Sequence, residues 1–145
     1  MYDYMWELHG SLFQRQMIAE INSHYKVDAV VMDGIKAFVT GGPDSGRVVE
    51  PGLLLASCEP VAIDAVGVAV LKLYGTKGKI GEAPVFEQDQ LKRAAELGLG
   101  VKSPEEIQLS PLNDEAKGDA DQIEGVPQNS GARMETLIKK IRRQS

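Results

Sequence analysis

Two stretches decide the fold: VDAVVMDG at residues 27–34 and GLLLASCEPVAIDA at residues 52–65. Each contains a short apolar run between acidic or small residues, which is typical of a buried strand. Pro60 follows the second run, and proline suits the first position of a helix because its missing N–H is not needed there. That helix is expected to reach Tyr74, just before Gly75. Strands followed by a helix predict an α/β domain.

Further elements fit around these two stretches. Apolar residues recur at helical spacing in residues 11–25 and in residues 87–97, so each segment is predicted to be a helix. Residues 107–109 indicate one more strand. The stretch GGPDSG at residues 41–46 is the strongest turn signal in the chain. We therefore expect a small mixed or parallel sheet flanked by about three helices.

The character of the chain changes after Pro111. Residues 112–131 are polar and acidic, which predicts a flexible, disordered linker. Residues 132–145 are basic and carry apolar residues at helical spacing, which predicts a C-terminal amphipathic helix or a solvated tail. The expected organisation is an α/β domain over residues 1–111, forming the C-terminal half of a larger domain, followed by these two segments.

The composition of the chain excludes several classes of partner and cofactor site. The 145 residues fit one domain, and the formal net charge of -5 argues against nucleic acid as the main partner. The single cysteine, Cys58, excludes an intrachain disulfide and a self-contained four-cysteine iron–sulfur or zinc site. The sequence shows no secretory signal and no apolar run long enough to cross a bilayer, so we expect a cytoplasmic protein without a membrane segment.

A candidate site follows from the two strands. In open α/β sheets, ligands bind beyond the carboxyl ends of the strands. If the two strands are neighbours, their ends, the glycine-rich turn and the first turn of the helix at Pro60 should converge. The backbone N–H groups of that helix start would favour an anion or a carboxylate. The ligand-binding candidates are Asp33, Gly34, Gly41, Gly42, Ser57 and Asp64.

Several of these residues have a structural and a functional interpretation. Asp64 lies in an otherwise apolar helix, where it either pairs with nearby backbone or side chains, or joins Asp33 as a carboxylate pair for a metal ion or proton transfer. The turn at residues 41–46 is either a structural turn, the commoner case, or a phosphate cradle. Cys58 is expected to be a buried, inert thiol. His9 and His24 are too far apart along one helix to share a metal.

The run VDAVVMDGIKAFVTGGPDSG, followed by LLLASCEPVAIDAVG, resembles a family known as domain of unknown function 362, over residues 8–109. This resemblance implies an α/β domain found beside ferredoxin-like modules that carry a 4Fe-4S cluster, in iron–sulfur cluster-binding proteins of electron transfer. The family's N-terminal half and its cysteine-rich motif are absent from this sequence. The implied partners are therefore that missing half and a ferredoxin-like module, with no cofactor within this segment itself.

Three hypotheses about function follow. The first is a non-catalytic domain of a redox-associated iron–sulfur protein, which binds a small ligand or packs against the redox module. The second is half of an enzyme active site, in which Asp33 and Asp64 supply carboxylates. The third is a scaffold or interaction module.

Overall fold

The computed structural model describes residues 2–42, 44–124 and 134–140. Its helices are α1 (Tyr2–Gly10), α2 (Gln14–Asn22), α3 (Pro60–Leu73), α4 (Gly78–Glu82), α5 (Asp89–Leu97) and α6 (Asp114–Glu124). Its strands are β1 (Val30–Gly34), β2 (Ala37–Phe38), β3 (Val48–Val49), β4 (Leu53–Ser57), β5 (Ile107–Pro111) and β6 (Met134–Lys140). Short 3-10 turns cover Val85–Glu87 and Pro104–Glu106.

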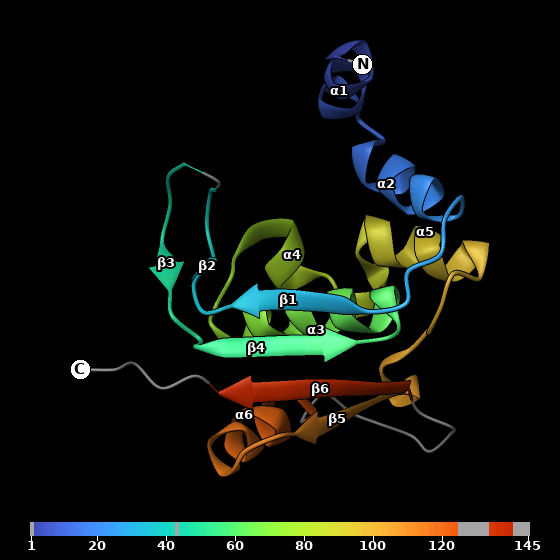
Figure 1. Ribbon diagram of the computed structural model, residues 1–145. Helices are drawn as coiled ribbons and strands as arrows, with labels where there is room; N and C mark the ends of the chain where they lie inside the picture. Colours follow the sequence, from blue (N-terminus) through green and yellow to red (C-terminus); the bar gives the residue numbers. More distant parts are fainter. Residues whose placement is uncertain (1, 43, 125–133, 141–145) are drawn as a thin grey trace.

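The main sheet has four strands in the order β1-β4-β6-β5 (Figure 1). β4 pairs antiparallel with both β1 and β6, whereas β5 and β6 are parallel. The predicted small mixed sheet flanked by helices is therefore confirmed. β2 and β3 form a separate two-stranded hairpin that connects β1 to β4.

The core lies between one face of this sheet and helices α3 and α6, which also contact each other. Side chains alternate across the sheet, so Leu53 and Leu55 of β4 are buried toward α3, together with Ile138 of β6. On the other face, Val31 of β1 is 66% exposed. The helices thus cover a single face of the sheet.

Helix α3 begins and ends at signals that the sequence carries. Pro60 occupies its first turn, and the Glu59 side chain accepts hydrogen bonds from the backbone N–H groups of Val61 and Ala62. At the other end, Arg47 donates to the carbonyls of Tyr74 and Gly75. A carboxylate at the first turn and a cation at the last both match the helix dipole.

The expectation of a disordered linker is wrong for residues 114–124, which form α6. Asp114 and Glu115 favour the helix start, where the dipole is positive. The helix buries a narrow face made of Ala116, Ala120 and Ile123 against the sheet. Alanines contribute little to an apolar sequence pattern, so the sequence gives little sign of this face. Residues 125–131 lie outside the described part of the chain.

The expectation of a C-terminal helix or solvated tail is wrong for residues 134–140, which form strand β6. Thr136 and Ile138, two residues apart, are both 0% exposed, as expected for a strand with one buried face. Ile138 pairs with Leu55 of β4 on one side and with Pro111 of β5 on the other. β6 therefore joins β4 to β5. Residues 141–145 lie outside the described ranges.

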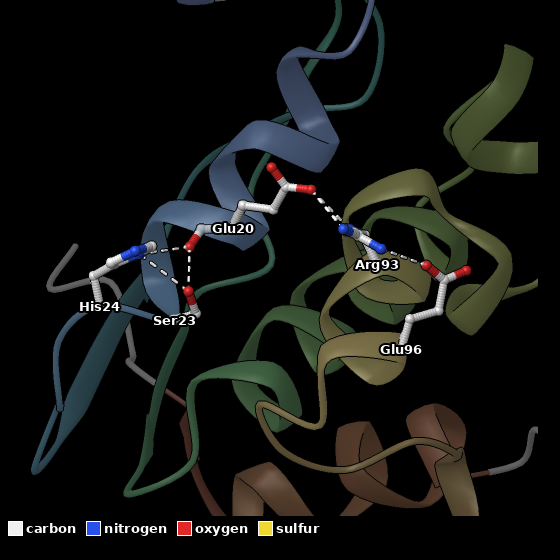
Figure 2. A network of polar contacts seen from close by, with 5 residues as sticks. All are labelled: Glu20, Ser23, His24, Arg93 and Glu96. Atoms are coloured by element: carbon white, nitrogen blue, oxygen red, sulfur yellow. Dashed lines mark hydrogen bonds and ion pairs between the residues drawn. The ribbon is translucent and has the colours of Figure 1, made fainter.

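Helix α2 packs against α5 through an ion pair shown in Figure 2. The Arg93 guanidinium donates through Nε and Nη2 to Glu20 Oε1, at 3.0 and 2.7 Å. Its Nη1 donates to Glu96 of the same helix. α1 contacts α2 and leaves Trp6 80% exposed. Among the described residues, no helix has the length and apolar character needed to cross a membrane.

Candidate functional site at the start of helix α3

The predicted convergence of two strand ends is wrong, because β1 and β4 are antiparallel. Asp33 at the end of β1 pairs with Leu54 near the start of β4. Ser57 at the end of β4 pairs with Val30 at the start of β1. The carboxyl ends of the two strands therefore lie at opposite ends of the pair. The candidate residues fall into two groups, one at each end of α3.

The glycine-rich turn belongs to the C-terminal end of α3. Gly41 and Gly42 have φ values of 67° and 90°, and the Gly42 N–H donates to the Ser45 carbonyl. Thr76, which follows α3, donates through its hydroxyl to the Val39 carbonyl of the hairpin. A helix C-terminus carries partial negative charge, so this end does not favour a phosphate. The geometry of the segment is that of a hairpin turn.

Asp33 and Gly34 lie beside this hairpin. Asp33 Oδ1 accepts a hydrogen bond from the Ile35 N–H at 2.8 Å, and Gly34 lies close to the Leu53 carbonyl. Met32, the neighbour of Asp33, packs against Gly67 of α3. Because side chains alternate along a strand, the Asp33 carboxylate points to the open face of the sheet, away from α3.

A groove of about 920 Å³ lies at the other end, where α3 begins. Helices α2 and α5 form one wall, the first residues of β1 form the other, and α3 forms the floor. The residues that carry the following argument are Asp28, Cys58, Glu59, Asp64 and Gln90. Ser57 lies directly before this groove, is 6% exposed, and accepts a hydrogen bond from the Glu59 N–H through Oγ.

The N–H groups at the start of α3 already have an acceptor. Glu59 Oε1 accepts from Val61 N–H at 3.0 Å, and Oε2 accepts from Ala62 N–H at 2.5 Å. The carboxylate is buried, as Glu59 is 7% exposed. The anion that the sequence predicted at this helix start is therefore the side chain of the chain's own Glu59 rather than a ligand.

Asp64 is the most unusual charge in the groove. It is half-buried in α3, and Oδ2 accepts a hydrogen bond from Gln90 Nε2 of α5 at 2.6 Å. Burial raises the pKa of this carboxyl above its ordinary value, and the hydrogen bond from Gln90 opposes that rise. Within the described residues, the other carboxylate oxygen receives no hydrogen bond. It is available to a ligand.

The remaining candidates are placed as follows. Cys58 is exposed at the groove, so the expectation of a buried thiol is wrong. His9 contacts Gln14. His24 contacts Ser23 and the Glu20 carbonyl (Figure 2). Among the described residues, no group of three or more His, Cys, Asp or Glu side chains is placed to hold a metal ion. A metal at Asp33 and Asp64 stays a prediction.

The segment from α1 to the middle of α3 contains both groups of candidate residues. Residues 3–69 match the family model described as Domain of unknown function (DUF362). The expected resemblance is thereby confirmed for these residues, and the DUF362 match includes Asp33, Ser57 and Asp64 but ends before Gln90. The search of curated proteins and the search of solved structures each gave no match.

The residues of this chain do not fit a 4Fe-4S cluster. Such clusters are held by about four cysteine thiolates. The whole sequence contains one cysteine, Cys58. Any cluster that accompanies this segment would have to be bound by other residues.

Proposed function

We propose that this segment is a non-catalytic, ligand-binding domain of a redox-associated iron–sulfur protein, and that its ligand occupies the groove at the start of α3. The observation that carries the proposal is Asp64. A half-buried carboxylate that is partnered on one oxygen by a neutral amide is costly for the fold. Such groups are common at functional sites, because a ligand can bind the polar atom that has no partner within the fold.

The shape and chemistry of the groove support this role. Ligand sites are concave, largely apolar, and contain a few polar groups that orient the ligand. Val30, Met32, Pro60 and Leu99 supply apolar walls, and Asp64 with Gln90 supplies the polar group. The groove lies where three helices meet the edge of the sheet, so its walls are held by the packing of the core.

The redox association is supported by the resemblance described above, which implies a ferredoxin-like module as a neighbour. Anaerobic reconstitution of the chain with iron and sulfide tests the part that concerns this segment. We expect no stable cluster absorption, because one cysteine cannot hold it. A stoichiometric 4Fe-4S cluster on this chain would overturn the assignment of the cluster to other residues.

A fragment screen followed by ¹H–¹⁵N NMR tests the groove. We expect fragments that carry a hydroxyl or an amine to shift the amides of Asp64, the Gln90 side chain and Ala29. Asp64→Asn should weaken these fragments. Asp33→Asn, which alters the open face of the sheet, serves as the matched control and should not. Shifts confined to the hairpin, or an absence of binding across the screen, would refute the proposal.

Half of an enzyme active site is the second candidate, since a smaller cavity between β1 and α3 is lined by both Asp33 and Asp64. The alternation of β1 weakens it, because the Asp33 carboxylate points away from α3. Titration with Mg²⁺ distinguishes the two candidates. A joint response of the two carboxylates would favour the enzyme, and a response of neither would remove its main support.

A further inference from the structure

The two edges of the main sheet differ. At the β5 edge, the Leu109 N–H donates to Glu124 Oε1 of α6 at 3.0 Å, and Pro111 has no N–H to offer. At the β1 edge, no hydrogen bond within the described part of the chain reaches the backbone groups of Val30–Gly34 that point away from β4. The β5 edge is thus partly covered by α6, whereas the β1 edge is open.

Asp33 is the one charged residue of the open edge strand, and its side chain points away from α3. Edge strands of soluble proteins commonly carry lysine, proline or a bulge. β1 has the sequence VVMDG and pairs with β4 in continuous register from Val30 to Gly34. Val31 exposes 66% of its surface. An edge of this kind is a template for another strand.

The groove at the start of α3 runs along this same edge. Asp28, Val30 and Met32 line it from the side of the sheet, and Ile63 and Asp64 line it from α3. Every second side chain of a strand added beside β1 would therefore point into the groove. Proteins that bind extended peptides by strand addition combine an open sheet edge with a groove that receives alternate side chains of the peptide.

The charged residues that line the groove indicate the charge of the segment that binds there. Its described lining includes three carboxylates, those of Asp28, Glu59 and Asp64, against one lysine, Lys26. The Glu59 carboxylate is bound to the start of α3, which leaves Asp28 and Asp64 to face a ligand. A second copy of β1 would bring another acid and no base within Val30–Gly34. The complementary segment is therefore basic.

We propose that the β1 edge receives an extended segment of another polypeptide as an added strand, with alternating apolar side chains and one basic side chain directed at Asp64. This inference rests on the proposed function of the same groove and names its ligand. The backbone of the segment pairs with the outer groups of β1, and its apolar side chains meet Val30, Met32 and Leu99. Its basic group pairs with the available oxygen of Asp64.

The peptide acetyl-Thr-Val-Thr-Lys-Thr-Val-Thr-amide is the probe. We expect saturable binding by calorimetry, with slowed hydrogen exchange of alternate amides in Val30–Gly34. Replacing its lysine by glutamate should abolish binding. Asp64→Asn should weaken binding at least about tenfold, which is the effect of one charge-assisted hydrogen bond. Asp121→Asn in α6, which packs near the other edge of the sheet, should leave affinity within about twofold.

Backbone methylation of the peptide isolates the strand pairing. Methyl groups on the amide nitrogens that face β1 should prevent binding, whereas methyl groups on the alternate nitrogens should not. Equal effects of the two methylation patterns would overturn the proposal. So would an absence of peptide binding when fragments still bind in the groove, and in that case the proposed function would stand.

Sedimentation of the protein alone completes the test. We expect a monomer whose state does not change on addition of the probe peptide. A dimer that the peptide dissociates would mean that a second copy occupies the β1 edge, and it would overturn the assignment to another polypeptide. If neither fragments nor the peptide bind, both the proposed function and this inference fail.

Discussion

The carboxylate of Glu59 lies so close to Gly100 that a methyl group on Gly100 would overlap Oε1. Gly100 follows α5 in the chain, whereas Glu59 caps α3, so this approach joins two helices at the groove. The glycine serves to provide space. It allows the buried carboxylate to reach the N–H groups of Val61 and Ala62.

Gly100→Ala should destabilise the domain by about 1–2 kcal/mol, the usual cost of losing a helix cap. The added methyl group would displace the Glu59 carboxylate from the start of α3. Urea unfolding followed by circular dichroism measures the loss. Gly118→Ala is the matched control, because nothing lies within 4 Å of that position in α6. It should stabilise the domain by about 0.5–1 kcal/mol.

Glu59→Ala should cost a similar amount, about 1–2 kcal/mol, and should make Gly100→Ala less costly. Once the carboxylate is gone, the methyl group at position 100 no longer meets Oε1. A double-mutant cycle on unfolding free energies measures this coupling. Strictly additive effects of the two substitutions would contradict the contact.

Ile138→Ala in β6 should destabilise the domain by about 2–5 kcal/mol, since a fully buried side chain would leave a cavity. Ile138 is 0% exposed and lies between β4 and β5. Leu112→Ala is the control, because Leu112 is 59% exposed and should cost well under about 1 kcal/mol. Similar unfolding free energies for the two variants would contradict the position of β6 between β4 and β5 in the main sheet.

This part of the fold was not predictable from the sequence for a physical reason. Met134, Leu137, Ile138 and Ile141 are spaced as on a helix, and a short apolar run does not by itself separate helix from strand. The strand forms because β4 and β5 each offer β6 an edge, which is information about distant residues. By contrast, a proline or a glycine indicates a helix boundary without reference to distant residues. In the structure, α3 begins at Pro60 and α5 ends just before Gly98.

The direction of β1 and β4 could have been predicted. Parallel neighbours need a crossover of about a dozen residues, usually a helix. Between Gly34 and Leu53 the chain offers only the glycine-rich turn and short extended pieces, so a hairpin connection and an antiparallel pair follow. The unusual position of Asp64 is visible in the sequence, because an acid within an apolar helix is recognised without knowing its neighbours. Its partner Gln90 carries no such signal.

Asp64→Asn should stabilise the protein at neutral pH by about 1 kcal/mol, at the lower end of the cost of a poorly satisfied buried group. Burial raises the pKa of Asp64, so the folded state binds more protons than the unfolded state between the ordinary and the raised pKa. The stability of the wild type should therefore fall as the pH rises through that window. The advantage of the variant should disappear below the ordinary pKa. Urea unfolding across a pH series measures both.

Asp114→Asn supplies a control of opposite sign. Lys117 lowers the pKa of Asp114, so its contribution to stability is present above the ordinary pKa and is lost as the pH falls through the lowered one. The variant should lose this favourable contribution at neutral pH. An advantage of Asp64→Asn that persists at the lowest pH would point to a cause other than ionisation.

Arg93→Gln should loosen α2 from α5 and accelerate hydrogen exchange of the α2 amides about twofold. Arg93 contacts Glu20 with both Nε and Nη2, but the two side chains are 35% and 49% exposed, so water screens the pair. Added salt should reproduce part of the effect in the wild type. Lys117→Gln, which breaks an exposed pair within α6, should leave α2 exchange unchanged.

The position of β6 bears on how the protein is made. β6 follows β1, β4 and β5 in the chain, yet it lies between β4 and β5 in the sheet. During synthesis the antiparallel β1–β4 pair can form early, whereas β4 and β5 each keep an unpaired edge until residue 140 has left the ribosome. The two strand edges that β6 fills are thus exposed between the synthesis of β5 and that of β6, and chaperone binding should concentrate in this interval.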